Sequence, residues 1–406
     1  MTDETPRKWI GTLSDHAIWP LLAVTAASVI TERFLLFAVV VAAILIVVRW
    51  VATGAPVVRT RADWPILILA LMACLSLLIT ARPDLTVPQV ERLLLGMALY
   101  YGLACWARTP GRITLISLGF TLAGLLLACM APFSMQWMGE KFTFLPASLY
   151  THFVVLTADT INPNVMAGYL ALLLPCVLAP LLFAWKELRR WQRGSYSFVT
   201  VMMLLVLVVT QSRAGIFAAT VGLLVLAMLR WRWAWVITVG GVTAALIAGR
   251  SLTSLMSEVV STDGLPLRME VWSRGWYMLQ DFAFTGIGMG SFPYVTERFY
   301  PLVLQATLPH SHNLFLQVAV DLGVPGLIAW LSVLFLTIAS AWTAYRHSIA
   351  TDKRLLAGIA AGLLAAQAVM IIHGMFDAVT WGMVRPAVLI WGLWGTAVAA
   401  LRVANT

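Results

Sequence analysis

Long apolar segments recur along the chain and are separated by shorter polar ones. Each runs for roughly 16 to 22 residues, about the length of one helical crossing of a ~30 Å hydrocarbon core. The alternation over about ten positions that a membrane β-barrel needs is not found. The pattern predicts an all-α polytopic membrane protein of about twelve transmembrane helices. These spans are 17–31, 33–51, 64–80, 91–107, 113–132, 163–184, 196–211, 214–229, 233–249, 324–345, 355–376 and 384–401.

Two of the intervening segments, 133–162 and 250–311, are longer than a turn and hold many of the polar groups. In the larger one, residues 266–276 are typical of a short amphipathic helix with proline in its first turn. A second helix should begin within residues 310–313, where Ser311 or Asn313 could cap it. We therefore expect one transmembrane domain over 1–406 with two extramembrane loops, the larger containing short helices.

Composition and charge agree with a lipid-embedded chain. Hydrophobic residues make up 61% of the sequence and charged residues 11%, so a soluble surface could not be covered. The net charge of +9 does not indicate nucleic acid binding, because the basic residues cluster in short loops. With a cytoplasmic N-terminus, the cytoplasmic side holds 17 of the 27: Arg7, Lys8, Arg49, Arg59, Arg61, Arg108, Arg112, Lys186, Arg189, Arg190, Arg193, Arg230, Arg232, Arg346, Lys353, Arg354 and Arg402. This distribution predicts that both termini are cytoplasmic and both long loops lie outside.

The most specific local pattern is His312-Asn313, nine further residues, and then Gly323-Val324-Pro325-Gly326. It resembles the signature of bacterial O-antigen ligases, within the wider O-antigen ligase and polymerase family. Residues 210–215 (TQSRAG) and the block from 267 to 292 also resemble this family, and residues 162–164 and Asp377 are similar to weaker family positions. The resemblance spans roughly residues 150 to 380, and over the first five helices it is one of topology alone.

The resemblance implies a reaction and its partners. Members transfer a glycan from undecaprenyl diphosphate to a sugar hydroxyl of the lipid A-core oligosaccharide, at the periplasmic face of the inner membrane, without metal or other cofactor. Membrane lipid surrounds the chain, and no nucleic acid takes part. The positions that match the family and would contact substrate are Asn164, Arg213, Arg268, Asn313 and Asp377, with His312 as the catalytic residue. Arg274, on the same predicted loop helix as Arg268, is a further candidate for substrate binding.

Arginine suits a diphosphate, because its planar fork pairs with phosphate oxygens. Arg213 lies between two apolar segments, where an unpaired charge is costly; its alternative role is that of a snorkelling side chain or topology marker. Arg268 could instead lie on a solvated loop helix. Arg274, six residues further on, points about 120° away on the same helix, so at most one of the two faces the site, and the resemblance favours Arg268.

A neutral imidazole is a suitable general base for the acceptor hydroxyl, and we assign this role to His312. In the first turn of a helix, the positive dipole end would favour its neutral form. The alternative is a capping or packing histidine at the membrane interface. A single in-line displacement by the acceptor would invert the anomeric centre.

No metal site is predicted. His310 and His312 are two residues apart and do not share a helix face, and the chain has no Asp-x-Asp motif. His373 and Asp377 are spaced i, i+4; a metal pair is one reading, and a buried hydrogen-bonded pair that positions Arg213 or the substrate is the one we favour. Trp137, Trp272 and Trp276 could stack on sugars, or could belong to an interfacial aromatic belt.

Three alternatives remain. An O-antigen polymerase or a protein O-oligosaccharyltransferase would use the same donor, but the histidine motif favours a ligase over a polymerase. A transporter of lipid-linked oligosaccharide belongs to another class, since charges within the membrane also mark translocation paths. Against a transporter, no internal repeat is visible, and the polar groups gather at the outer ends of the spans.

Overall fold

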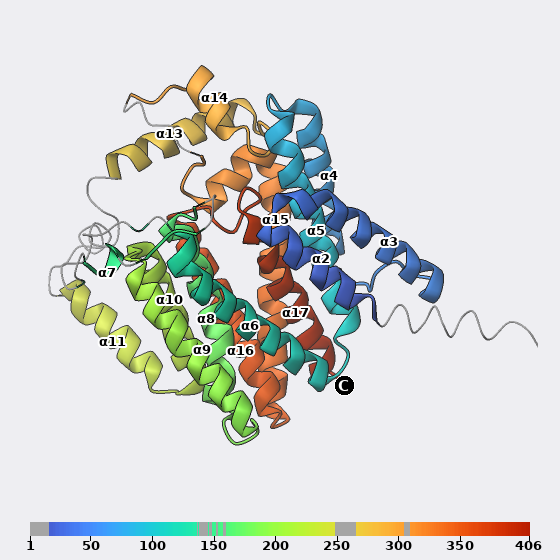
Figure 1. Cartoon of the computed structure of the whole chain (residues 1–406), viewed down its shortest axis with the longest axis vertical. Helices are drawn as coiled ribbons and strands as arrows, with labels where there is room; N and C mark the ends of the chain where they lie inside the picture. Colours follow the sequence, from blue (N-terminus) through green and yellow to red (C-terminus); the bar gives the residue numbers. More distant parts are fainter. Residues whose placement is uncertain are drawn as a thin grey trace, which may run out of the picture. The chain divides into compact units, whose positions relative to one another are not determined.

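The computed structural model describes residues 16–135, 137, 145, 148–151, 153–156, 160–247, 265–303 and 309–406. Apart from one isolated bridge between Met135 and Ile161, the regular elements of these residues are helices. The longer helices are α2 (Ile18–Ile30), α3 (Leu35–Thr53), α4 (Asp63–Ile79), α5 (Pro83–Trp106), α6 (Pro110–Ser134), α8 (Pro163–Ala184), α9 (Arg190–Val209), α10 (Arg213–Arg230), α11 (Ala234–Ile247), α13 (Leu265–Asp281), α15 (Leu314–Ala350), α16 (Arg354–Gly374) and α17 (Val388–Ala404) (Figure 1). The shorter ones are η1 (Glu32–Phe34), α7 (Ser148–Thr151), α14 (Phe292–Phe299) and η3 (Arg385–Ala387).

The predicted all-helical fold is confirmed in the described residues, and each predicted span coincides with a helix. Eight described helices are long and apolar enough to cross a membrane, and α2 and α4 are shorter apolar helices. The number of twelve crossings therefore stays a prediction. Residues 250–264 and 304–308, and parts of 133–162, lie outside the described residues, so the predicted loops are described only in part.

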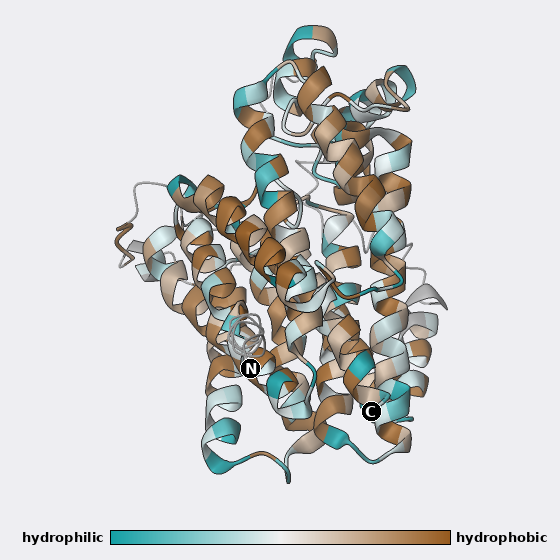
Figure 2. Cartoon of the chain, turned by 90° about the vertical axis from the view of Figure 1, so that its right-hand side faces the viewer, coloured by the Kyte–Doolittle hydropathy of each residue, from teal (hydrophilic) through white to brown (hydrophobic). Residues whose placement is uncertain are grey.

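The faces that the helices leave exposed are apolar, as expected for contact with lipid. Figure 2 shows hydrophobic colouring along the long helices. On α3 the exposed large apolar side chains are Leu36, Phe37, Val40, Ile44, Val47, Trp50 and Val51.

The chain divides into two compact units. Unit 1 comprises Met1–Ile113, Met269–Ser340 and Ala378–Thr406. Unit 2 comprises Thr114–Arg268 and Ala341–Asp377. The expectation of a single domain stays a prediction.

In unit 1 the core forms where α5 packs against α17. Small residues allow the close approach: a Cβ on Gly395 would lie 2.5 Å from the carbonyl oxygen of Tyr100, and one on Gly96 would overlap the ring of Trp391. The short helix η1 connects α2 to α3. Its Glu32 accepts a 2.7 Å bond from Arg92, which is otherwise buried on α5.

In unit 2 the central pair is α8 and α16, with α10 packed against both (Figure 1). A buried apolar cluster joins these helices through Ala179, Phe183, Leu226, Ala361 and Ala365. A Cβ on Gly362 would lie 3.0 Å from the carbonyl oxygen of Pro175, so a larger residue would push α16 away from α8.

Candidate functional site

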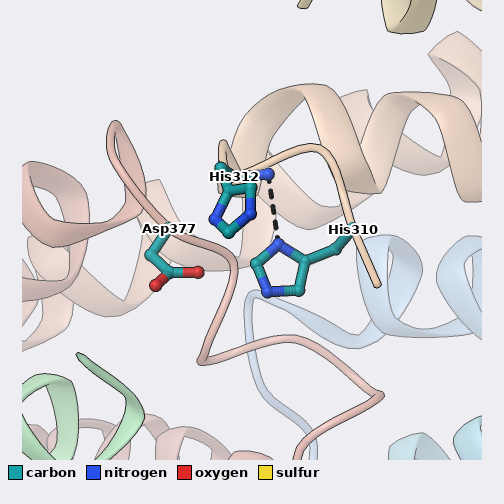
Figure 3. Close-up of side chains that lie close together, drawn as sticks. All are labelled: His310, His312 and Asp377. Carbon is teal, nitrogen blue, oxygen red and sulfur yellow. Dashed lines mark hydrogen bonds between the residues drawn. The ribbon is translucent and has the colours of Figure 1, made fainter. Parts of the chain in front are cut away.

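The histidine turn of unit 1, residues 310–313, precedes α15. The backbone N–H of His312 donates to Nδ1 of His310 at 3.1 Å, and the two ring centroids are 4.4 Å apart (Figure 3). Nδ1 of His310 is therefore an acceptor, so a neutral His310 carries its proton on Nε2. His312 has a φ of +50°, a left-handed conformation that is uncommon outside glycine and asparagine.

The predicted place of His312 in the first turn of a helix was wrong. The helix α15 begins at Leu314, and Asn313 is its cap, since Oδ1 of Asn313 accepts from the N–H of Leu316 at 3.0 Å. The predicted capping role of Asn313 is thereby confirmed. The Asn313 side chain takes the place of a backbone acceptor at the start of the helix, so the regular helix begins at Leu314, two residues after the histidine. The histidine still lies at the positive end of the helix dipole.

A buried polar chain holds this turn from within α15. The N–H of Ser311 donates to Oε1 of Gln317 at 2.7 Å, and Nε2 of Gln317 donates to Oδ1 of Asp321 at 2.9 Å. The indole N–H of Trp381 donates to the other carboxylate oxygen of Asp321 at 2.8 Å. Gln317 and Asp321 are each 1% exposed, so these bonds are shielded from water.

Asp321 and Gln317 were missed from the sequence. The signal was a carboxyl and an amide spaced i, i+4 in an otherwise apolar run, which places both on one helix face. Their connection to Ser311 and Trp381 depends on the tertiary structure.

Gly323, the first glycine of the signature, lies at the kink of α15. Gly323 has φ 69° and ψ −178°, a conformation open almost only to glycine. Pro325 has no N–H for the carbonyl of Asp321, which instead accepts from Gly288 at 3.2 Å. In the same way, Val324 donates to the carbonyl of Ala283 at 2.7 Å, leaving the carbonyl of Val320 to accept from Ile287 at 2.9 Å.

The segment 283–290 thus docks against the kink of α15, and its glycines permit the contact. A Cβ on Gly286 would lie 2.5 Å from the carbonyl oxygen of Asp321, and Gly286, Gly288 and Gly290 all have positive φ. The other side of the segment is held by α5, where the Thr86 hydroxyl donates to the carbonyl of Met289 at 2.6 Å. The histidine turn and the glycine segment therefore form one rigid assembly within unit 1.

The predicted helix at 266–276 is confirmed and extends as α13 to Asp281. Arg274 lies 3.6 Å from the carboxylate of Glu270, one turn earlier, within unit 1. The same carboxylate accepts from the N–H of Val303. Arg274 is thus already paired with an acid. The carboxylate of Glu270 also holds the segment that follows α14, through its bond to Val303.

In unit 2, Arg213 is the first residue of α10, after a buried turn. Ser212 caps the helix by accepting from Gly215 at 3.2 Å, and Gln211, fully buried, has a φ of +52°. The amide of Gln211 donates to the hydroxyl of Tyr150. Arg213 itself is half-buried and makes no hydrogen bond or ion pair with any described residue of its unit. Its guanidinium is a candidate for an anionic ligand.

Arg268, also in unit 2, is held by the end of α16. Its Nη1 donates to the carbonyl of Phe376 at 2.8 Å. Burial lowers the pKa of the guanidinium, and the charge of Asp377 opposes that shift. Asp377 and His373 are 5% and 3% exposed. Asp377 lies beyond the last residue of α16, and its N–H donates to the carbonyl of His373 at 3.0 Å.

The remaining candidates have mixed settings. Asn162 caps α8 by accepting from the N–H of Asn164 at 2.8 Å, which leaves Asn164 half-buried in the first turn. Trp137 stacks on Phe153 with centroids 4.7 Å apart, so one of its faces is already used. Trp276 is 55% exposed. Roles of Asn164, Asn313, Asp377 and these tryptophans in substrate binding stay predictions.

Comparison with known proteins identifies one family. Residues 198–331 match a family model described as O-antigen ligase. The segment includes Arg213, Arg268, Arg274, His312, Asn313 and Gly323, but not Asn164 or Asp377. A search of curated proteins finds no match. Members of this family are membrane enzymes of glycosyl transfer, in agreement with the apolar helices of a multi-pass membrane protein. The match over residues 198–331 supports the membership of this chain in the O-antigen ligase family.

Proposed function

We propose that this chain is an O-antigen ligase of the bacterial inner membrane. It transfers a glycan from undecaprenyl diphosphate to the lipid A-core oligosaccharide at the periplasmic face, and both termini are cytoplasmic. The reaction needs no metal or other cofactor. The observation that carries the proposal is the histidine turn, which lies in the family segment and is fastened by buried hydrogen bonds to Gln317 and Asp321.

His312 is proposed as the general base. The acceptor hydroxyl loses its proton as its oxygen bonds to the anomeric carbon and the bond to the diphosphate breaks. A base must be held within hydrogen-bond reach of that proton, and a fixed turn lowers the entropic cost of this positioning. The positive end of the α15 dipole favours the neutral imidazole that such a base requires.

Arg213 and Arg268 are proposed to bind the anionic donor. Arg213 offers a guanidinium that makes no hydrogen bond or ion pair with a described residue of its unit, and Arg268 is partly shielded from water, which strengthens its electrostatic interactions. Arg274 is the weaker candidate because Glu270 already neutralises it. Bound guanidinium groups would stabilise the negative charge that grows on the leaving diphosphate.

Two related enzyme activities use the same donor and differ from a ligase in the product that they form. A polymerase would join the glycan to another lipid-linked glycan, and a protein O-oligosaccharyltransferase would attach it to a hydroxyl of a protein. A transporter would move the lipid-linked sugar without breaking the anomeric bond. The histidine turn supports an enzyme, because transport needs no general base.

The test uses the full chain reconstituted in vesicles with undecaprenyl diphosphate-linked glycan and purified lipid A-core, in the presence of EDTA. Wild type should form the conjugate, and His312→Ala, still folded, should not. His347→Ala is the matched control, since His347 is an exposed histidine outside the family segment and should not matter.

The other outcomes each contradict the proposal. Elongated donor would identify a polymerase, and loss of activity with EDTA would show a metal requirement. If lipid-linked sugar crosses the bilayer while no product forms, the chain is a transporter.

A further inference from the structure

A pocket in unit 1 lies among α2, α3 and α5. Its lining residues are distant in sequence from the histidine turn and lie outside the segment that matches the family model. The walls come from residues spaced i, i+3, i+4 and i+7 on two helices, so each helix presents a single face to it. On α3 these residues are Ala42, Leu45, Ile46 and Arg49, and on α5 they are Ala98, Tyr101, Gly102 and Cys105.

The pocket has an apolar part and a basic part. Leu21, Leu45 and Ala98 line the apolar part, whereas Arg49 near the end of α3 and Arg108 just after α5 line the basic part. The charge rule assigns this basic part to the cytoplasmic side of the membrane. An occupant that satisfies both parts must be amphiphilic and negatively charged at one end.

The two arginines have donors to spare. The Nε of Arg49 is buried and has no hydrogen-bond partner among the residues that the structure describes. Arg108 uses only its Nε within the described chain, donating to the carbonyl of Cys105 at 2.9 Å. A buried guanidinium donor without a partner is unfavourable, so a ligand oxygen there would remove a cost.

The surrounding charges also favour an anion. Further arginines of unit 1 lie in the same cytoplasmic segments, namely Arg59, Arg61 and Arg112. Among the residues that the structure describes, the acid Asp63 lies near these arginines in sequence but does not line the pocket. Its carboxylate accepts from the Thr60 hydroxyl at 2.6 Å and from the Tyr101 hydroxyl at 2.9 Å.

We propose that this pocket binds an anionic phospholipid of the membrane. Arg49 and Arg108 donate to the headgroup phosphate, and part of one acyl chain lies along Leu21, Leu45 and Ala98. Basic pockets between membrane helices at the cytoplasmic side are suited to such headgroups. The fork of arginine pairs with phosphate oxygens, and a free phosphate would leave the apolar wall without an occupant. This site is independent of glycosyl transfer.

The test is native mass spectrometry of the purified full chain, exchanged into detergent with equal amounts of phosphatidylglycerol and phosphatidylcholine. Wild type should retain phosphatidylglycerol selectively. Arg49→Gln with Arg108→Gln should retain about tenfold less, because two charge-assisted contacts are lost. The matched control is Arg59→Gln with Arg61→Gln, which removes the same charge from exposed residues at the same end and should lower retention far less than the pocket variant.

A filling variant tests the apolar part without changing charge. Ala98→Leu keeps both arginines and should also lower retention, which remains informative if the double arginine variant fails to fold. Equal retention by the pocket variants and the control would overturn the proposal. Displacement of phosphatidylglycerol by excess inorganic phosphate would also overturn it, since the site would then take a free anion.

Discussion

The side-chain amide of Gln317 donates to the carboxylate of Asp321 at 2.9 Å, one turn further along α15, and both residues are buried. Gln317 also accepts from the N–H of Ser311, the residue before His312. The pair therefore connects the proposed base to the helix that follows it. Asp321 is a positioning residue for this turn, since its own contacts are with Gln317 and Trp381.

Asp321→Asn should loosen this connection. The carboxylate accepts on both oxygens, from Gln317 and from Trp381, whereas asparagine has one oxygen, so one buried donor would lose its partner. We expect a loss of about 1–3 kcal/mol in the free energy of unfolding, a lower Tm and a lower kcat for glycan transfer. Ser332→Ala, on an exposed part of the same helix, should change neither. A Tm equal to wild type for Asp321→Asn would contradict the assigned role.

Gly323→Ala should destabilise the kink of α15. The backbone conformation of Gly323 is open almost only to glycine, and a Cβ would lie 2.8 Å from the carbonyl oxygen of Ala283. The strain should cost about 1–3 kcal/mol, measured as a lower Tm in detergent. Gly119→Ala is the control, because Gly119 lies in α6 with nothing within 4 Å of the added Cβ. Its Tm should stay equal or rise slightly.

Arg213→Gln and Arg268→Gln should separate binding from stability. Arg213 makes no hydrogen bond or ion pair with the described residues of its unit, so its replacement should leave the Tm unchanged while lowering kcat/KM for the lipid-linked donor by about tenfold or more. Arg268→Gln should lower the Tm as well, because the carbonyl of Phe376 would lose a charged donor. Unchanged kcat/KM for Arg213→Gln would refute its role in donor binding.

Tyr300 should titrate late. Burial and the hydrogen bond from its hydroxyl to the carboxylate of Asp281 raise the pKa of Tyr300 to about 12. A raised folded-state pKa means that the stabilising contribution is complete below the ordinary value of about 10 and is lost as pH rises toward the folded value. The ultraviolet tyrosinate signal that disappears in Tyr300→Phe measures this titration. In Asp281→Asn it should move to lower pH, and an unchanged midpoint there would exclude the carboxylate as a cause.

Local sequence information was sufficient for the helices and for the signature residues. Each apolar run predicted a span that coincides with a helix. A helix in lipid satisfies its backbone hydrogen bonds internally, so the length and hydropathy of a segment are enough to predict it. Pro266 and the apolar spacing after it likewise located α13. The predicted start of α15 within residues 310–313 lies one to four residues before the observed start at Leu314, because several residues there are compatible with a helix start and only the bond from Leu316 to Asn313 identifies the cap.

The tertiary structure alone decided how the signature works. The role of Gly323 depends on the segment 283–288, about 35 to 40 positions earlier in sequence. N–H groups of this segment donate to the carbonyls of α15 that have no helical donor because of Pro325 and the kink. The second carboxylate oxygen of Asp321 accepts its hydrogen bond from Trp381, 60 residues away in sequence. Hydropathy and helical spacing describe each segment against its solvent and its own neighbours. Hydrogen bonds between distant segments depend on how those segments pack, and no local pattern in this chain encodes them.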